Sequence, residues 1–513
     1  MRKKLNPYAL AVIMGVSLVM TGCGNTSTDS TTSTSTAEET TEETEDTEEA
    51  NESEETEDDS EEETGEVTYT KLTKDDLTLE NTIEATEDDE HAIEVDGTEE
   101  SYSNTEVIKT GDSDDGDEAD FYGYNSAIFA TNGATLDLTG MYINTNGQHA
   151  NAVFSYGEGT TVNISDSVIE TTGNTSGGLM TTGGGTMNAT NVTVHTTGNS
   201  SAAIRSDRGG GDVNVTGGYF VTDGVGSPVI YSTADITVDG AYLESTASQG
   251  VVVEGANSVT LNDVTLVADN TTKNGDNSDY YQAVMIYQSM SGDADSGESS
   301  FTMSGGSLTN NTGDIFFVTN TVATIDLNDV DITNNDADGI FLRASAAGWG
   351  TDGSNGGQVT LTAADQEIDG DIYVDSVSTL NFYLTDDSTY TGAINSDGEE
   401  GEVYVEIEDG SVWVLTGDSY ITALTCGADA IDLNGYTLYI DGVAYEEGSE
   451  STGEAIEAAT TSTGSSDSGM PSGEAPSGEA PSGEAPERPD EDSSDGSAPS
   501  FDGETPPDKP DGE

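Results

Sequence analysis

The stretch PVIYSTADITVDGAYLESTASQGVVVEGANSVTLNDVTLV (residues 228–267) contains two successive copies of one pattern, and this pattern decides the fold. In each copy an apolar triplet (228–230 or 251–253) is followed by an apolar, polar, apolar run (236–238 or 259–261). A turn dipeptide and a third short apolar run complete the copy. Alternation with a period of two residues is typical of a strand with one buried face.

The apolar triplet recurs ten times along the chain, at intervals of 23 to 33 residues and with a period near 25. The third residues of the triplets are Phe129, Phe154, Met180, Ile204, Ile230, Val253, Ile286, Phe317, Leu342 and Tyr373. Short strands about eight residues apart, without helical periodicity between them, predict one coil of a parallel β-solenoid with three faces. Each coil must stack on a neighbour about 4.8 Å away to bury its inward face.

We therefore predict an all-β protein, a right-handed parallel β-helix of about 25 residues per coil, because parallel crossovers prefer the right-handed sense. The predicted domain covers residues 67–448, and its first part, 67–125, is less regular and is expected to include a cap. An array of β-sandwiches is the competing fold, but such domains would repeat about every 100 residues. The chain has no repeat of that length.

The N-terminus has the layout of a secretory signal. Basic residues at 2–4 precede an apolar run of 13 residues, 8–20, which is too short to span a membrane comfortably. The end of this run resembles the lipobox of bacterial lipoprotein signals, with Met20 where leucine is usual and Cys23 as the residue to be acylated. This resemblance implies a signal peptide over 1–22 and a lipid anchor outside the bacterial cell membrane. The alternative is an ordinary cleaved signal in which Cys23 takes no part.

Two segments are predicted to be disordered. Residues 38–66 contain 18 acidic side chains and no basic or aromatic one, so 23–66 should form a self-repelling stalk rich in Thr, Ser and Glu. Residues 449–513 are rich in Ser, Gly, Pro and Glu and repeat Pro-Ser-Gly-Glu-Ala, which is typical of an extended tail.

The overall charge narrows the possible partners. With 100 acidic and 12 basic side chains, the formal net charge is −88, which argues against a nucleic-acid-binding protein because such proteins need clustered Lys and Arg. Only two cysteines are present, so packing rather than a disulfide framework must hold the domain together.

Aspartate-rich turns are candidate calcium sites, because hard cations prefer several oxygen ligands on a bent backbone. The segment 334–339 places Asn334, Asp336 and Asp338 at alternate positions before a glycine. Two similar segments contain Asp117 with Asp120 and Asp276 with Asp279. The competing explanation is that Asp and Asn simply favour turns.

The residue after each apolar triplet is expected to point outward. The predicted surface ladder is Ala130, Ser155, Thr181, Arg205, Tyr231, Glu254, Tyr287, Val318 and Arg343. Its middle part, Arg205, Tyr231, Glu254 and Tyr287, together with Trp349 on a glycine-rich insertion, suits stacking on sugar rings and bonding to hydroxyl or carboxylate groups. Trp413 is also expected to alternate outward. Ordinary exposed side chains are the alternative interpretation of this set.

The coil period, the Asn and Asp turns and the segment 205–211 (RSDRGGG) carry a resemblance to known proteins. Residues 126–448 resemble the pectate-lyase-like superfamily of right-handed β-helices. The whole chain resembles secreted bacterial lipoproteins with an adhesin-like or carbohydrate-binding β-helix. This resemblance implies either calcium-assisted cleavage of an acidic polysaccharide or binding without cleavage.

Three functions follow as hypotheses. The first is a lipid-anchored, non-enzymatic surface protein that binds polysaccharide or another surface ligand. The second is a polysaccharide lyase or hydrolase with Arg205, Asp207 and Arg208 in its site, although 205–208 departs from the lyase catalytic pattern. The histidines occupy unrelated positions of the repeat, so no catalytic triad is evident. The third is a structural envelope spacer.

Overall fold

A computed structural model describes residues 69–273, 277–398 and 401–457, all within the unit Val67–Glu513. The predicted signal peptide, Cys23, the acidic stalk and residues 458–513 of the predicted tail lie outside the described residues. In the part of the chain that is described, no helix is long and apolar enough to cross a membrane.

The largest sheet, sheet A, has 21 strands, and most coils contribute two segments to it. The first segment carries the apolar, polar, apolar run, and we call these the first strands: β3 (Glu99–Ser103), β6 (Thr135–Thr139), β9 (Thr161–Ser165), β12 (Gly185–Thr190), β15 (Gly211–Thr216), β18 (Asp235–Asp239), β21 (Ser258–Ala268), β23 (Glu298–Asn310), β25 (Thr321–Asn328), β28 (Gly357–Ala364), β31 (Thr379–Thr385), β33 (Glu402–Ile407) and β36 (Ala423–Cys426). The second strands are β1 (Asn81–Ala85), β4 (Thr105–Lys109), β7 (Tyr142–Thr145), β10 (Val168–Thr171), β13 (Thr193–Thr196), β16 (Tyr219–Thr222), β19 (Tyr242–Ser245) and β26 (Asp331–Asn334), continued by the last parts of β21 and β23.

Sheet B has 11 strands, one from each coil up to that of β31. Its strands are β2 (Ile93–Asp96), β5 (Ile128–Thr131), β8 (Val153–Tyr156), β11 (Leu179–Thr182), β14 (Ile204–Ser206), β17 (Ile230–Ser232), β20 (Val251–Glu254), β22 (Gln282–Tyr287), β24 (Asp314–Thr319), β27 (Leu342–Ala344) and β30 (Ile372–Val374). Two smaller sheets follow near the C-terminal end: β29 (Glu367–Asp369), β32 (Thr389–Thr391), β34 (Val412–Val414) and β37 (Ile431–Asp432), then β35 (Ser419–Ile421), β38 (Leu438–Ile440) and β39 (Val443–Ala444).

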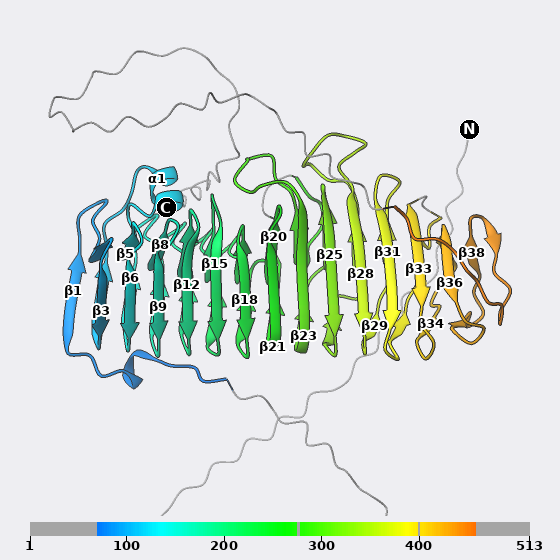
Figure 1. The fold of residues 1–513 in the computed structure, drawn as a ribbon, viewed down its shortest axis with the longest axis horizontal. Helices are drawn as coiled ribbons and strands as arrows, with labels where there is room; N and C mark the ends of the chain where they lie inside the picture. Colours follow the sequence, from blue (N-terminus) through cyan, green and yellow to red (C-terminus); the bar gives the residue numbers. More distant parts are fainter. Residues whose placement is uncertain (1–68, 274–276, 399–400, 458–513) are drawn as a thin grey trace, which may run out of the picture. The chain divides into compact units, whose positions relative to one another are not determined.

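The strand pairing confirms an all-β fold built of stacked parallel strands. Val153 pairs with Ile128 on one side and with Leu179 on the other, 25 and 26 residues away. Among the described residues, antiparallel pairing is confined to β38 with β39 and to an isolated bridge between Cys426 and Ser451. In Figure 1 the first strands therefore lie side by side from β3 to β36 in sequence order. This arrangement is compatible with a β-helix.

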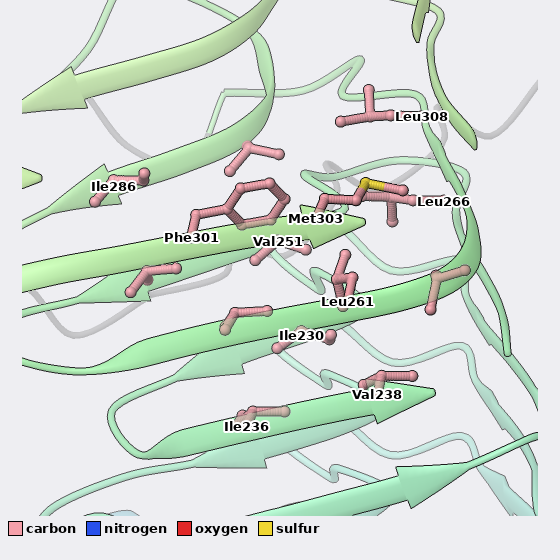
Figure 2. Close-up of a cluster of buried hydrophobic side chains, with 14 of the residues drawn as sticks. Ile230, Ile236, Val238, Val251, Leu261, Leu266, Ile286, Phe301, Met303 and Leu308 are labelled. Carbon is pink, nitrogen blue, oxygen red and sulfur yellow. The ribbon is translucent and has the colours of Figure 1, made fainter. Parts of the chain in front are cut away.

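One apolar column of the first strands shows how the coils hold together. Its members are 0–1% exposed and continue through eight successive coils: Leu136, Val162, Met187, Val213, Ile236, Val259, Phe301 and Ile325. Figure 2 shows Ile236, Leu261, Phe301 and Met303 of this sheet facing Ile230, Val251 and Ile286 of sheet B. The period-two pairs predicted from the sequence are thus the core, and their burial is the main stabilising term of the stack.

A threonine and glycine corner repeats after the second strands. Three buried threonines each donate from Oγ1 to a carbonyl oxygen five residues later: Thr171 to Ser176, Thr196 to Ser201 and Thr222 to Ser227, at 2.5–2.7 Å. At Gly198, an added Cβ would lie 1.8 Å from the carbonyl oxygen of Gly173 on the neighbouring coil. Only glycine allows this approach, so this corner also fixes the spacing between coils.

The chain leaves the β pattern at one short helix, α1 (Gly116–Tyr122), and at a 3-10 turn, η1 (Lys74–Asp76). The side chain of Asp115 accepts a hydrogen bond from the Glu118 amide, and Gly123 ends the helix with φ 79°. The acidic segment with Asp117 and Asp120, which the sequence interpretation treated as a turn, is therefore helical. Its acidic first turn suits the positive end of a helix.

Candidate functional site

The outward column of sheet B corrects the ladder predicted from the sequence. In strand register it consists of Phe129, Phe154, Met180, Arg205, Tyr231, Val252, Met285, Phe317, Arg343 and Tyr373. Ala130, Ser155, Thr181 and Val318, which were expected to face outward, are 0% exposed. In those coils the inward residue is the second of the triplet, and a slip of one residue reverses every side chain.

Insertions cover the two apolar parts of this outer face. Phe129, Phe154 and Met180 form one buried group, and α1 lies nearby, since the ring of Tyr122 is 5.8 Å from that of Tyr156. A second group contains Val252, Met285 and Phe317, against which Trp349 packs from the insertion between β27 and β28. Phenylalanine and methionine face outward here because loops, rather than the core, exclude water from them.

A polar aromatic cluster packs against the second of these apolar groups. Tyr287 donates to Oε2 of Glu254 at 2.8 Å, and the Tyr231 hydroxyl donates to the same oxygen. The two hydroxyl oxygens are 3.3 Å apart, and the rings of Tyr287 and Trp349 meet edge to face at 5.2 Å. The structure thus brings together four of the five residues predicted to bind ligand.

Burial dominates the electrostatics of this cluster. It raises the pKa of Tyr231 and of Tyr287 well above the ordinary tyrosine value, and the neighbouring charge of Glu254 adds to both shifts. Both phenols therefore stay protonated and donate. Glu254 is 1% exposed, and its other oxygen, Oε1, is buried and has no hydrogen-bond partner. Buried polar atoms normally find partners, so this oxygen is an unsatisfied position within the cluster.

Arg205, the fifth predicted ligand-binding residue, forms an ion pair with Asp207, with Nη2 and Oδ2 2.8 Å apart. Burial raises the pKa of Asp207 to about 6, against the lowering effect of Arg205. Arg208 points elsewhere: its Nε lies 2.6 Å from Asp293 and its guanidinium stacks on Phe121 at 3.8 Å. The three residues considered for catalysis therefore include one close pair and one separate cation.

Asp120 has a different environment from the calcium ligand that was predicted. It is 8% exposed on α1, and its Oδ2 lies 3.0 Å from Nδ1 of His149. Its charge acts on Arg205 and on Asp207, which places it beside that ion pair. Asp120 lies on α1 and His149 lies in the connection between β7 and β8, so sequence spacing gave no sign of their contact.

The other calcium candidates are engaged in turns or lie apart. Asp336 accepts hydrogen bonds from the amides of Gly313 and Asp338, and Oδ1 of Asn334 accepts from the Asp336 amide. These backbone donors lower the pKa of Asp336. Asp338 is exposed at the tip of this turn.

Asp117 is also exposed, and Asp279 lies on the surface 2.8 Å from Lys273. Asp276 lies outside the described residues. Within the described ranges, no group of three or more His, Cys, Asp or Glu side chains is placed to hold a metal ion.

Two features were missed or misplaced in the sequence interpretation. Trp413, expected to face outward, is 0% exposed, and its Nε1 donates to the Gly392 carbonyl at 2.9 Å. At the C-terminal end of sheet B, a hollow of about 210 Å³ is lined by residues that include Arg343, Tyr373 and Asp397. The guanidinium of Arg343 lies 4.0 Å from the ring centroid of Tyr280 and 5.3 Å from that of Tyr373, which alternation along one strand could not reveal.

Comparison of the chain with protein-family models, with curated proteins and with solved structures finds no match.

Proposed function

We propose that this chain is a surface-displayed binding protein. In this proposal a lipid at Cys23 anchors it outside the bacterial membrane, and a right-handed parallel β-helix of the pectate-lyase-like type presents a polysaccharide-binding site. The site is the outer face of sheet B around Tyr231, Glu254, Tyr287 and Trp349. Calcium is an optional partner in this proposal, as a bridge between the acidic protein and an acidic polysaccharide.

The convergence of the aromatic and carboxylate side chains carries the proposal. Tyr231, Tyr287 and Trp349 are all partly exposed, although they come from three different coils or insertions. Aromatic rings with a polar edge suit a ligand that is apolar on one face and rich in hydroxyls at its rim. Glu254 accepts hydrogen bonds from both phenols, so the two tyrosine rings are held in fixed positions for a ligand.

Retention on immobilised polysaccharides tests this function. The full chain would be passed over plant, mucin and bacterial polysaccharides with calcium or with chelator, and new reducing or unsaturated ends would be measured in the same samples. We expect retention without new ends. The Trp349→Ala chain should lose retention, whereas Tyr436→Ala, which removes a 43% exposed ring near the C-terminal end, should keep it. Equal retention of both variants would place the site elsewhere.

A lyase or hydrolase is the second candidate, and one observation favours it. The pKa of Asp207, raised to about 6, suits a group that exchanges protons near neutral pH, and Arg205 lies beside it. New chain ends that disappear in the Asp207→Asn variant would replace the binding function by this one. Silence in both measurements would favour the envelope spacer.

A further inference from the structure

The outer face of the first strands between β6 and β28 is an uncovered array of short polar side chains, which we call the polar face. Strand register arranges it in three columns: Thr135, Thr161, Thr186, Asp212, Asp235, Ser258, Ser300, Thr324 and Thr360; Asp137, Asn163, Asn188, Asn214, Thr237, Thr260, Thr302, Asp326 and Thr362; and Thr139, Ser165, Thr190, Thr216, Asp239, Asn262, Ser304, Asn328 and Ala364.

The composition of the polar face indicates what it attracts. Its columns contain five aspartates but no lysine, arginine or aromatic residue. A hollow of about 280 Å³ opens where Asp137, Asn163 and Asn188 line the surface. The negative charge favours a cationic partner, and the absence of aromatic rings disfavours the sugar stacking proposed for sheet B.

The protein already seats one extended segment on the continuation of this face. Thr425 of β36 donates from Oγ1 to the Gly453 carbonyl at 3.3 Å and accepts from the Gly453 amide at 3.0 Å. Asn381 of β31 binds Ile456 similarly: its Nδ2 donates to the Ile456 carbonyl at 3.1 Å, and its Oδ1 accepts from the Ile456 amide at 3.0 Å. Side chains of the first strands thus bind the backbone of a chain that crosses the coils.

The spacing of these contacts can be continued along the stack. Three extended residues span about 10 Å, and two coil steps at about 4.8 Å span nearly the same length. A segment in this direction therefore presents one amide group to every second coil. Thr425 and Asn381 lie two coils and one outward column apart, so the seated segment crosses the strands obliquely. Two coils beyond Asn381, its column contains Thr324, whose hydroxyl can donate and accept as that of Thr425 does.

A second seated segment shows how lysine is accommodated. Near the N-terminus the chain runs over the second strands, where Lys71 lies over the ring of Tyr219 at 4.4 Å and Lys74 pairs with Glu106. The Leu72 amide donates to Oγ1 of Thr193 at 2.9 Å. Both seated segments place a backbone amide on a threonine hydroxyl.

We propose that the polar face binds an extended, lysine-bearing polypeptide segment of a partner molecule. Threonine and serine hydroxyls of the face form hydrogen bonds with the backbone amides of the segment at every third residue, and the aspartates attract its lysines. A proline at a contacting position would remove the required donor, so the segment is poor in proline. This face and this partner are separate from the polysaccharide site on sheet B.

Fluorescence anisotropy with the full chain tests the proposal. The probe is a labelled twelve-residue peptide made of four Ala-Lys-Thr repeats. We expect saturable binding that weakens with salt. Thr161→Val and Thr186→Val combined in one chain should bind about fivefold more weakly, because a segment that contacts every second coil meets one of these two hydroxyls in either register. Asp212→Asn should weaken binding and reduce its salt dependence. Thr351→Val, on an exposed loop outside the face, should bind as the unmodified chain does.

Three matched peptides test whether the face binds backbone amides of the segment. One is N-methylated at every alanine, one at every lysine and one at every threonine. At least one of them should bind about tenfold more weakly, and equal binding of all three would overturn the proposal. A polysaccharide that displaces the peptide with the same variant sensitivity would assign the face to polysaccharide instead. Much tighter peptide binding after deletion of residues 458–513 would assign it to this chain's own tail. Unchanged binding in Thr161→Val, Thr186→Val and Asp212→Asn together would also overturn it.

Discussion

The outer faces of the first strands and of sheet B stand on the same inner core but differ in every other respect. The polar face is bare and made of short hydroxyl, amide and carboxylate groups. The outer face of sheet B contains phenylalanine, methionine, tyrosine and arginine, and insertions lie over it. The repeat therefore forms the scaffold, whereas the insertions that depart from it form the candidate site.

The positions of the insertions explain this difference. First and second strands are joined by tight turns with positive φ, such as those at Asp166 and Asn191, which leave no room for a covering loop. The long connections instead adjoin sheet B, and the coil between Val251 and Val284 is stretched to 33 residues. Side chains that would otherwise be exposed there can be large and apolar, because the loops shield them.

The largest effect expected is on the inner core that both faces share. Phe316 is 0% exposed and meets Phe301 and Phe341 at 5.5 Å. Phe316→Ala should lower the free energy of unfolding by about 3–5 kcal/mol, because little can collapse into the cavity. Phe317→Ala, one residue away on the covered outer face, should cost less because its loop can move inward. Denaturant titration of both variants measures this, and equal losses would show that the covering insertions are as rigid as the core.

The sequence predicted the all-β parallel stack because its signals are local. Period-two runs such as that of Ile236 and Val238 depend only on which residues neighbour one another along one strand, and both side chains are buried. Even the irregular intervals of the repeat marked the coils that carry insertions. The Thr and Gly corner at 171–173 and 196–198 was present in the sequence as a repeated Thr-Thr-Gly-Asn and was overlooked.

The site was only partly predictable because it depends on which residue of a triplet faces inward. Hydrophobicity does not distinguish Ile128, which faces the core, from Phe129, which faces a covering loop. Arg205, Tyr231, Glu254 and Tyr287 were identified, but Glu254 and Tyr287 belong to a column two positions further along their strands. The contact of Asp120 with His149 depends on the path of an insertion, which no local pattern encodes.

The pH dependence of stability tests the buried ion pair on the outer face of sheet B. The pKa of Asp207 is raised to about 6 by burial, so the folded chain holds this proton more tightly than the unfolded chain does. Its contribution to stability is present below about pH 4 and is lost as the pH rises through 6. Between these values the unmodified chain should lose about 3 kcal/mol relative to Asp207→Asn. Unfolding free energies of both chains across this range measure the difference, and a constant difference would contradict the raised pKa.

The hydrogen bonds between asparagine side chains on the polar face should contribute less to stability than the core does. Asn188 donates to Oδ1 of Asn163 at 2.8 Å and accepts from Asn214 at 3.0 Å, but all three side chains are at least partly exposed. Because water can replace these bonds, Asn188→Ala should lower the unfolding free energy by only about 1 kcal/mol. Thr190→Ala, an exposed neighbour on the same strand, serves as the control. A loss as large as that of Phe316→Ala would mean that the ladder, and not the core, fixes the stack.

The smallest expected effect separates binding from stability on the polar face. Thr186 points outward beside Thr161 and Asp212, so Thr186→Val keeps the shape of the side chain and removes only its hydroxyl. The unfolding free energy should change by less than about 0.5 kcal/mol, as is usual for a surface position. A chain that is equally stable yet binds the lysine peptide more weakly would show that this hydroxyl serves recognition. A clear loss of stability would instead make the polar face part of the scaffold, and the contrast between the two outer faces would then be one of covering alone.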